Sequence, residues 1–206
     1  TNNTTVRSIL IGSDLYVSAL TVPAKSGAGA TITVSDTTAN QGGGPATATV
    51  TRFFLSTNST LDPTDTPLAG GHGVPALASG VSHSLSTSLT VPSVPTGTYF
   101  IIAKADDDND VLESKETNNT LAKSISIGSD LAITSFTAPA SSGAGASLTL
   151  NDSTTNQGGG SAGPTSTRFY LSADSSLDGN DTPLGNRAVP TLAAGAVSSA
   201  PTTVTI

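Results

Sequence analysis

The chain has 206 residues, of which 11% are charged and 4% are aromatic, and its formal net charge at pH 7 is −7. Cys is absent, which excludes disulfides, thiolate nucleophiles and iron–sulfur clusters, and the acidic balance weighs against nucleic acid and anionic lipid as partners. No apolar run is long enough to span a membrane, and charge is too sparse for a disordered chain, so the composition favours a folded, β-rich protein.

Seven strands are predicted in the first part of the chain, because short runs of β-forming residues alternate with Gly, Pro, Asn and Asp. The fifth strand shows the clearest period of two, with Leu85, Leu89 and Val91 on one face. The sixth is the most continuously apolar, so we expect it at the centre of a sheet, with Tyr99 or Phe100 supplying much of the aromatic core. The seven predicted ranges are 14–22, 30–38, 46–56, 68–77, 82–92, 97–106 and 119–127. No segment has a helical period, and we expect an all-β fold of seven-stranded sandwiches, immunoglobulin-like or fibronectin-III-like.

The chain repeats itself at an offset of 116 residues, as from Ser13 to Ser129. After Leu68 the offset becomes 115, which matches a deletion of one residue in a loop. The main repeated segments are 13–15 with 129–131, 40–44 with 156–160, and 52–56 with 168–172. The three glycines at 42–44 read as a flexible link between strands. Because 1–12 matches 117–128, the sequence predicts the last strand of a preceding repeat at 1–12, a complete unit at 13–128 and a C-terminally incomplete unit at 129–206.

The order of short motifs along 13–128 resembles the CARDB family, the cell-adhesion-related domain found in bacteria. The motifs are Ser13-Asp14-Leu15, Asn40-Gln41-Gly42, Phe54-Leu55-Ser56, Asp65-Thr66-Pro67-Leu68, Gly97-Thr98-Tyr99 and Glu116-Thr117-Asn118-Asn119. The resemblance implies a seven-stranded sandwich, export from a bacterial or archaeal cell, and tandem use in large surface or secreted proteins. It implies no catalytic activity.

An acidic loop follows the sixth predicted strand, and Lys115 is its single basic residue. Calcium takes six to eight oxygen ligands, which a loop rich in Asp and Asn can supply. The loop is therefore a candidate Ca²⁺ site, and we expect no other cofactor. The expected ligands are Asp106, Asp108, Asp110, Glu113 and Glu116, with Asn118 as a further candidate. The alternative is a solvated hairpin whose Asp and Asn side chains form turns.

A second loop rich in oxygen atoms occurs in both repeats. Its residues are Asn58, Asp62 and Asp65 in the first repeat, and Asp174, Asp178 and Asp181 in the second. The pattern suits either a structural turn or a second cation site.

Nothing in the sequence supports catalysis. His83 aligns with Ser198, and His72 has no clear counterpart in the second repeat, so both histidines read as surface residues rather than general bases. No nucleophile or acid–base pair is indicated, and we expect no enzyme activity within these residues.

These observations favour an extracellular, secreted or cell-surface array that acts as a structural stalk, adhesin or filament component. The expected partners are neighbouring repeats, identical chains, or a cell-surface or glycan ligand. Val6, Ile9 and Ile11 form a candidate donor strand that could add to an open sheet edge of another chain. The alternative function is a module that targets a larger secreted enzyme to a polysaccharide or other substrate.

Overall fold

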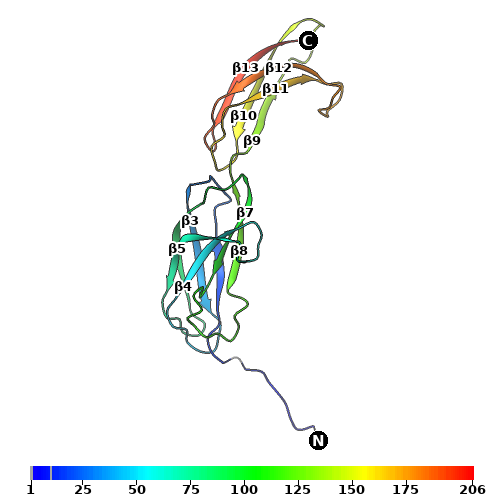
Figure 1. Cartoon of the computed structure of the whole chain (residues 1–206). Helices are drawn as coiled ribbons and strands as arrows, with labels where there is room; N and C mark the ends of the chain where they lie inside the picture. Colours follow the sequence, from blue (N-terminus) through cyan, green and yellow to red (C-terminus); the bar gives the residue numbers. More distant parts are fainter. Residues whose placement is uncertain (1, 10) are drawn as a thin grey trace. The chain divides into compact units, whose positions relative to one another are not determined.

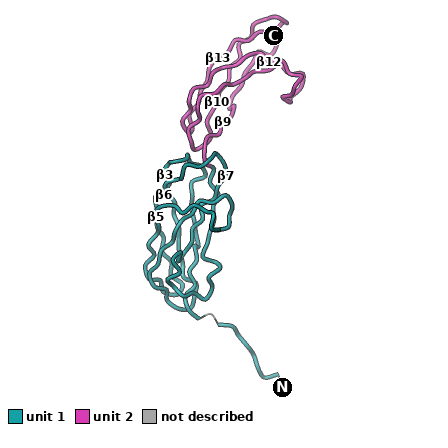
Figure 2. The backbone as a smooth tube through the Cα atoms, in the orientation of Figure 1, with its two compact units in different colours: residues 1–126 teal, residues 127–206 magenta. Residues whose placement is uncertain are grey.

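Alternating side chains build strands along most of the chain. The computed structural model describes residues 2–9 and 11–206 (Figure 1). The chain folds into two compact units, unit 1 at 1–126 and unit 2 at 127–206 (Figure 2). All regular structure in the described residues is β, as predicted, and none of it is a helix that could cross a membrane.

Unit 1 is a sandwich of two β-sheets. One sheet has the order β1-β3-β6 and the other the order β2-β8-β7-β4-β5. The strands are β1 (Leu15–Thr21), β2 (Lys25–Ser26), β3 (Thr31–Asn40), β4 (Thr49–Ser56), β5 (Thr66–Val74), β6 (Ser82–Thr90), β7 (Gly97–Lys104) and β8 (Thr120–Ile127). The seven predicted strands all form. The additional strand, β2, has two residues, which is too short to show a periodic pattern.

The core of unit 1 lies between these two sheets. β7 is central in its sheet, as predicted, and Ile101, Ile102 and Ala103 are fully buried. The aromatic core differs from the prediction, because Phe53 on β4 is the fully buried ring, whereas Tyr99 and Phe100 are only half-buried. Burial depends on which sheet covers a side chain, and a continuous apolar run does not specify that.

Unit 2 repeats the topology of the first five long strands. Its sheets have the orders β13-β10-β9 and β11-β12. The strands are β9 (Leu131–Thr137), β10 (Ser147–Asn156), β11 (Thr165–Leu171), β12 (Thr182–Val189) and β13 (Val197–Thr205). Within the described part of unit 2, no strand corresponds to β7 or β8.

The N-terminal segment 2–9 forms no strand, although its sequence matches that of β8. Val6, Ile9 and Ile11 are each at least 80% exposed. A strand is stable only when its backbone groups pair with a neighbour, and none pairs with 2–9 among the described residues. The predicted donor residues are therefore exposed and extended.

Candidate functional sites

A buried polar cluster occupies the inward face of β3 in unit 1. Period-two alternation along β3 directs Asp36 and Thr38 into the sandwich, where both are buried. His72 Nδ1 on β5 lies 2.8 Å from Asp36 Oδ2, and His72 Nε2 lies 2.7 Å from His83 Nδ1 on β6. Thr38 Oγ1 and Thr51 Oγ1 share a hydrogen bond of 2.6 Å. The cluster thus joins strands of both sheets.

His72 is not a surface residue, which corrects the sequence interpretation. Its side chain is fully buried, and both of its ring nitrogens are engaged inside the unit. The same offset of 115 that aligns His83 with Ser198 aligns His72 with Arg187. The alignment of these two positions was the sequence signal for a shared polar cluster. It was missed because the residue type changes from His to Arg.

Unit 2 builds the same cluster with an arginine in place of the histidine. Arg187 Nε donates to Asp152 Oδ1 at 2.7 Å and Arg187 Nη2 donates to Asp152 Oδ2 at 2.6 Å. Arg187 Nη1 also donates to Ser198 Oγ at 2.9 Å. Thr154 and Thr167 repeat the threonine pair, with their hydroxyl oxygens 2.9 Å apart. The hydrogen bonds from Arg187 hold the pKa of Asp152 below its usual value, and the same pairing raises the pKa of Arg187.

The Asn-Gln-Gly-Gly-Gly motif forms a tight loop, which corrects the interpretation of 42–44 as a flexible link. The buried Asn40 accepts from the backbone N–H groups of Asp14 and Gly42, and its amide donates to the carbonyls of Gly44 and Leu77. A Cβ on Gly42 would lie 2.6 Å from Asp14 N, so only glycine fits there. Asn156 and Gly158 repeat these contacts in unit 2.

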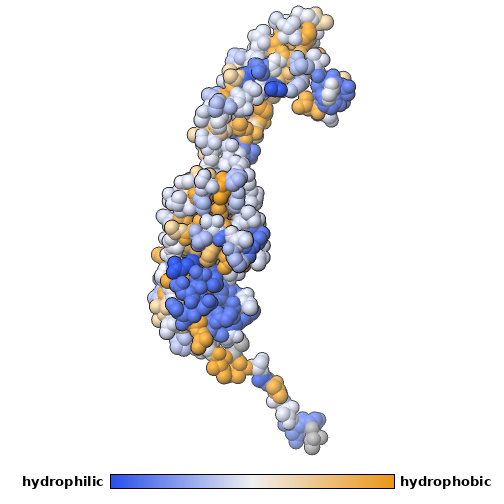
Figure 3. Space-filling model, in the orientation of Figure 1, coloured by the Kyte–Doolittle hydropathy of each residue, from blue (hydrophilic) through white to orange (hydrophobic). Residues whose placement is uncertain are grey.

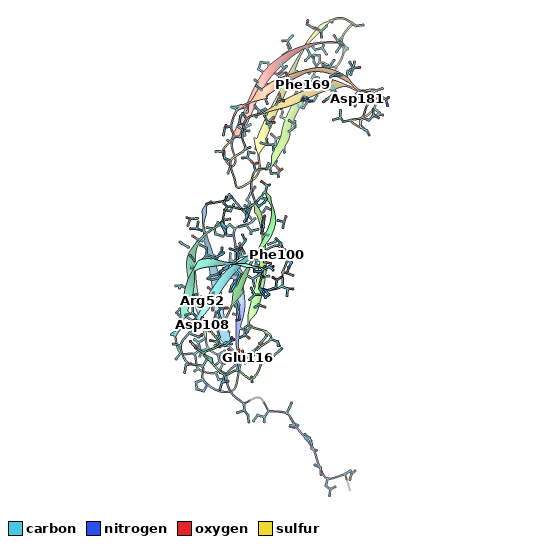
Figure 4. All side chains as sticks on the ribbon, viewed as in Figure 1. Arg52, Phe100, Asp108, Glu116, Phe169 and Asp181 are labelled. Atoms are coloured by element: carbon cyan, nitrogen blue, oxygen red, sulfur yellow. The ribbon has the colours of Figure 1, made fainter. Side chains whose placement is uncertain are left out.

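The acidic loop after β7 places its carboxylates in different environments. Asp106 is fully buried with φ +46°, and it accepts from Thr49 Oγ1 and from the backbone N–H groups of Asp110 and Val111. Asp108 faces outward and pairs with Arg52 Nη2 at 3.1 Å (Figure 4). Asp107 pairs with Arg52 and Lys104. Figure 3 shows a strongly hydrophilic patch on unit 1 in the region where Figure 4 labels Arg52 and Asp108.

The C-terminal part of this loop contains several buried oxygens. Glu113 Oε2 accepts from Asn119 Nδ2 at 3.0 Å, and Glu116 Oε1 accepts from the backbone N–H of Glu113 at 3.1 Å. Burial is the main cause that raises the pKa of Glu113 to about 7. In this part of the loop, three buried side-chain oxygens have no hydrogen-bond partner among the described residues, namely Glu113 Oε1, Asn118 Oδ1 and Asn119 Oδ1.

The predicted calcium ligands do not converge as one set. Nowhere in 2–9 and 11–206 do three or more His, Cys, Asp or Glu side chains gather as a metal would need. The physical reason is competition. Asp106 is already satisfied by the loop that it closes, and Arg52 attracts Asp108. Asp110 is exposed beside them. Calcium binding therefore stays a prediction.

The second oxygen-rich loop uses its side chains in turns. Asn58 Oδ1 accepts from Thr60 N, and Asp65 Oδ2 accepts from Asp62 N. Thr64 donates to Asp62, which holds the pKa of Asp62 below its usual value. In unit 2, Asp174, Asp178 and Asp181 accept in the same way from Ser176 N, Asn180 N and Asp178 N. These hydrogen bonds are those of Asx-type turns.

Comparison with known proteins places these two units in a family. The CARDB family model matches 12–123 and 128–206. The crystal structure of the CARDB domain of the PF1109 protein from Pyrococcus furiosus, in complex with di-metal ions, is 22% identical, with 60% of this chain and 95% of that chain covered and a TM-score of 0.45. A β-glucosidase 3B from Thermotoga neapolitana is 18% identical, with 56% and 16% of the two chains covered and a TM-score of 0.39. No curated protein matches the chain. Since the family model covers nearly every residue in two consecutive segments, this protein belongs to the CARDB family and contains the domain as tandem repeats.

Proposed function

We propose that the chain is a non-enzymatic, extracellular repeat array that serves as a structural stalk, adhesin or filament component of a prokaryotic cell surface. The observation that carries the proposal is what the two repeats share. Asp36 with Asp152 and Asn40 with Asn156 are buried residues that join strands and loops inside each unit. Repetition of internal, fold-specifying groups suits a protein that works by repeating a shape.

The location and the role are testable together. Antibodies against the chain should label intact cells of the source organism, and deletion of the coding region should reduce attachment to a surface or to other cells. Cells that bind the antibody only after lysis would refute the surface location. If intact native cells are labelled but the deletion leaves attachment unchanged, the adhesive role is refuted.

Calcium is a separate part of the proposal. It is supported by the three buried oxygens without partners, on Glu113, Asn118 and Asn119, because calcium binds carboxylate and amide oxygens. At ten times the dissociation constant, calcium would stabilise unit 1 by about 1.4 kcal/mol. The melting temperature of chain treated with EDTA should therefore rise when millimolar calcium is added. The rise should be lost in Glu113→Gln but kept in Asp62→Asn, which lies in the other loop. An unchanged melting temperature in the native chain would remove calcium from the account.

Glycan binding is the competing function, and one surface feature supports it. The exposed face of the β1-β3-β6 sheet carries a ladder of hydroxyls, in which Ser35 Oγ lies 2.7 Å from Ser86 Oγ and Thr37 Oγ1 lies 2.8 Å from Ser84 Oγ. In unit 2, Ser153 and Ser199 repeat this contact. Saturable retention of the chain on cell-wall polysaccharide, lost when Ser35 and Thr37 are replaced by Val, would favour a targeting module of a larger secreted enzyme over a stalk.

A further inference from the structure

The two units place different side chains against the same buried carboxylate. In unit 2, Arg187 donates to both carboxylate oxygens of Asp152, at 2.7 and 2.6 Å. A guanidinium group is always protonated in proteins, so this contact has a permanent positive charge. In unit 1 the equivalent position is His72, whose Nδ1 lies 2.8 Å from Asp36 Oδ2. An imidazole becomes charged only near or below about pH 6.5. The repeat therefore contrasts a fixed charge with a titratable one.

The carboxylate of Asp36 has no other cation to balance its charge. Asp36 is 2% exposed, and its Oδ1 atom is buried with no hydrogen-bond partner among the described residues. Thr38 Oγ1 donates to the other oxygen over a long 3.4 Å. Burial of an ionised carboxylate is costly unless a charge of opposite sign is close to it. The charge state of the neighbouring histidines therefore matters for unit 1.

The other charged groups around this cluster are engaged elsewhere or exposed. Arg52 on β4 pairs with Asp107 and Asp108, and Lys104 on β7 pairs with Asp107. The next buried carboxylate is Asp106, which accepts from Thr49 on β4. The remaining ionisable side chains of the unit 1 strands are half-buried or exposed, namely Tyr16 on β1, Lys25 on β2, Tyr99 on β7 and Lys123 on β8. The histidines are thus the groups that can respond to pH beside Asp36.

The contact between two ring nitrogens fixes how many protons this cluster holds. His72 Nδ1 donates to the ionised Asp36, and His72 Nε2 lies 2.7 Å from His83 Nδ1. At that contact one nitrogen must donate and the other must accept, so it holds a single proton. With these two protons both histidines are neutral and the cluster keeps the negative charge of the carboxylate. A third proton, at His83 Nε2, makes the histidine pair cationic and the cluster neutral.

His83 connects this buried cluster to solvent. It is half-buried on β6, whereas His72 is fully buried on β5. β5 and β6 are edge strands of the two different sheets, and they lie side by side in unit 1 (Figure 2). A proton can therefore reach the pair through His83 without separation of the sheets. The equivalent position in unit 2 is Ser198, which accepts from Arg187 and does not titrate.

We propose that Asp36, His72 and His83 form a pH switch in unit 1, which is the titratable counterpart of the permanent ion pair in unit 2. The switch is the uptake of one proton by the histidine pair, which neutralises the buried carboxylate. Since the carboxylate faces the histidines only in the folded unit, folding favours the protonated pair. The stability that the switch supplies is therefore present at acidic pH and is lost as the pH rises through the histidine range. The switch is independent of the surface role proposed above.

NMR of the histidine ring nitrogens tests the proton count in the full chain. The titration runs from about pH 5 to 8, the range in which histidines titrate, with EDTA present to exclude metal ions. His72 Nδ1 should stay protonated throughout, and the pair should take up one proton in a single step. A pair that keeps one protonation state over the whole range would overturn the proposal. Uptake of two protons would overturn it too, because the contact between the two nitrogens could not persist.

Urea titration followed by hydrogen exchange tests the effect on stability. The starting protein is Glu113→Gln, because Glu113 has a pH dependence of its own in unit 1. From about pH 5 to 8, the folding equilibrium constant should fall roughly tenfold when read at β3 and β5 of unit 1. The constant read at β10 and β12 of unit 2 should stay unchanged. Equal pH profiles for the two units would refute the switch.

Exchange of residues between the units provides the matched control. His72→Arg with His83→Ser gives unit 1 the side chains of unit 2, and the pH response of unit 1 should disappear. Arg187→His with Ser198→His makes the reverse exchange, and unit 2 should acquire the response. The proposal is wrong if either exchanged unit folds but keeps its original pH behaviour. If neither folds, the titration of the histidines in the native chain decides the question.

Discussion

Replacing Arg187 by Met tests the buried polar cluster of unit 2 most directly. The arginine side chain is 7% exposed, and it donates two short hydrogen bonds to the fully buried carboxylate of Asp152. Met retains much of the apolar volume but leaves this carboxylate without its cation. Breaking a buried ion pair by removing one partner costs about 3–5 kcal/mol, which is a large fraction of the stability of a domain.

The cost should depend on pH, and its sign can be worked out. In the native chain the pKa of Asp152 is lower in the folded state than in the unfolded state. The pair therefore contributes stability above the unfolded pKa, near 4, and loses it as the pH falls through the folded pKa. In the variant, the buried carboxyl has no cation and should hold a proton, so stability should instead fall as the pH rises above 4.

Urea titration followed by hydrogen exchange of β10 and β12 measures the loss in unit 2 separately from unit 1. The matched control is Arg168→Met, which removes an exposed arginine from the adjacent strand and should cost within about 0.5 kcal/mol. Adding Asp152→Leu to Arg187→Met should recover most of the stability, because an apolar pair needs no compensating charge. The reasoning fails if Arg187→Met costs no more than the control, or if the double variant is less stable than the single variant.

Three further variants test other parts of the structure. Glu113→Gln should raise the stability of unit 1 above pH 7 and flatten its pH dependence. Folding raises the pKa of Glu113 from 4.5 to about 7, so the native unit loses stability as the pH rises through that window. Thermal melts at pH 4 and pH 8 compare the two proteins, and parallel pH profiles would contradict the effect. Gly158→Ala should destabilise unit 2 by several kcal/mol, because the new Cβ would meet backbone atoms of 128–130. Gly163→Ala, which has open space around its Cβ, should change the stability of unit 2 little. Equal urea midpoints for the two variants would refute the close approach. Asn40→Asp should cost unit 1 about 2 kcal/mol or more, because it replaces the two-donor amide with an acceptor that faces two carbonyls, and a melting temperature equal to that of the native chain would exclude this role.

Two sequence interpretations failed for related reasons. The three glycines at 42–44 suggest freedom, but Gly42 is needed because the backbone of 12–14 approaches it closely. His72 lies in a glycine-rich segment, which suggests a surface loop, but its side chain on β5 points inward and contacts Asp36. In both cases the deciding contact comes from a part of the chain distant in sequence, so no local pattern could reveal it.

The amino-acid sequence by itself determined the strands, the sandwich class and the tandem repeat. Strand formation follows from period-two alternation and turn residues, which are local, and the repeat is visible as identical segments at a constant offset. Only the tertiary structure decided which polar groups are buried together and where each carboxylate of the acidic loop points. The reason is physical. The pairing of Asp152 with Arg187 depends on strands that are far apart in the chain, and it is set by which sheet covers which face.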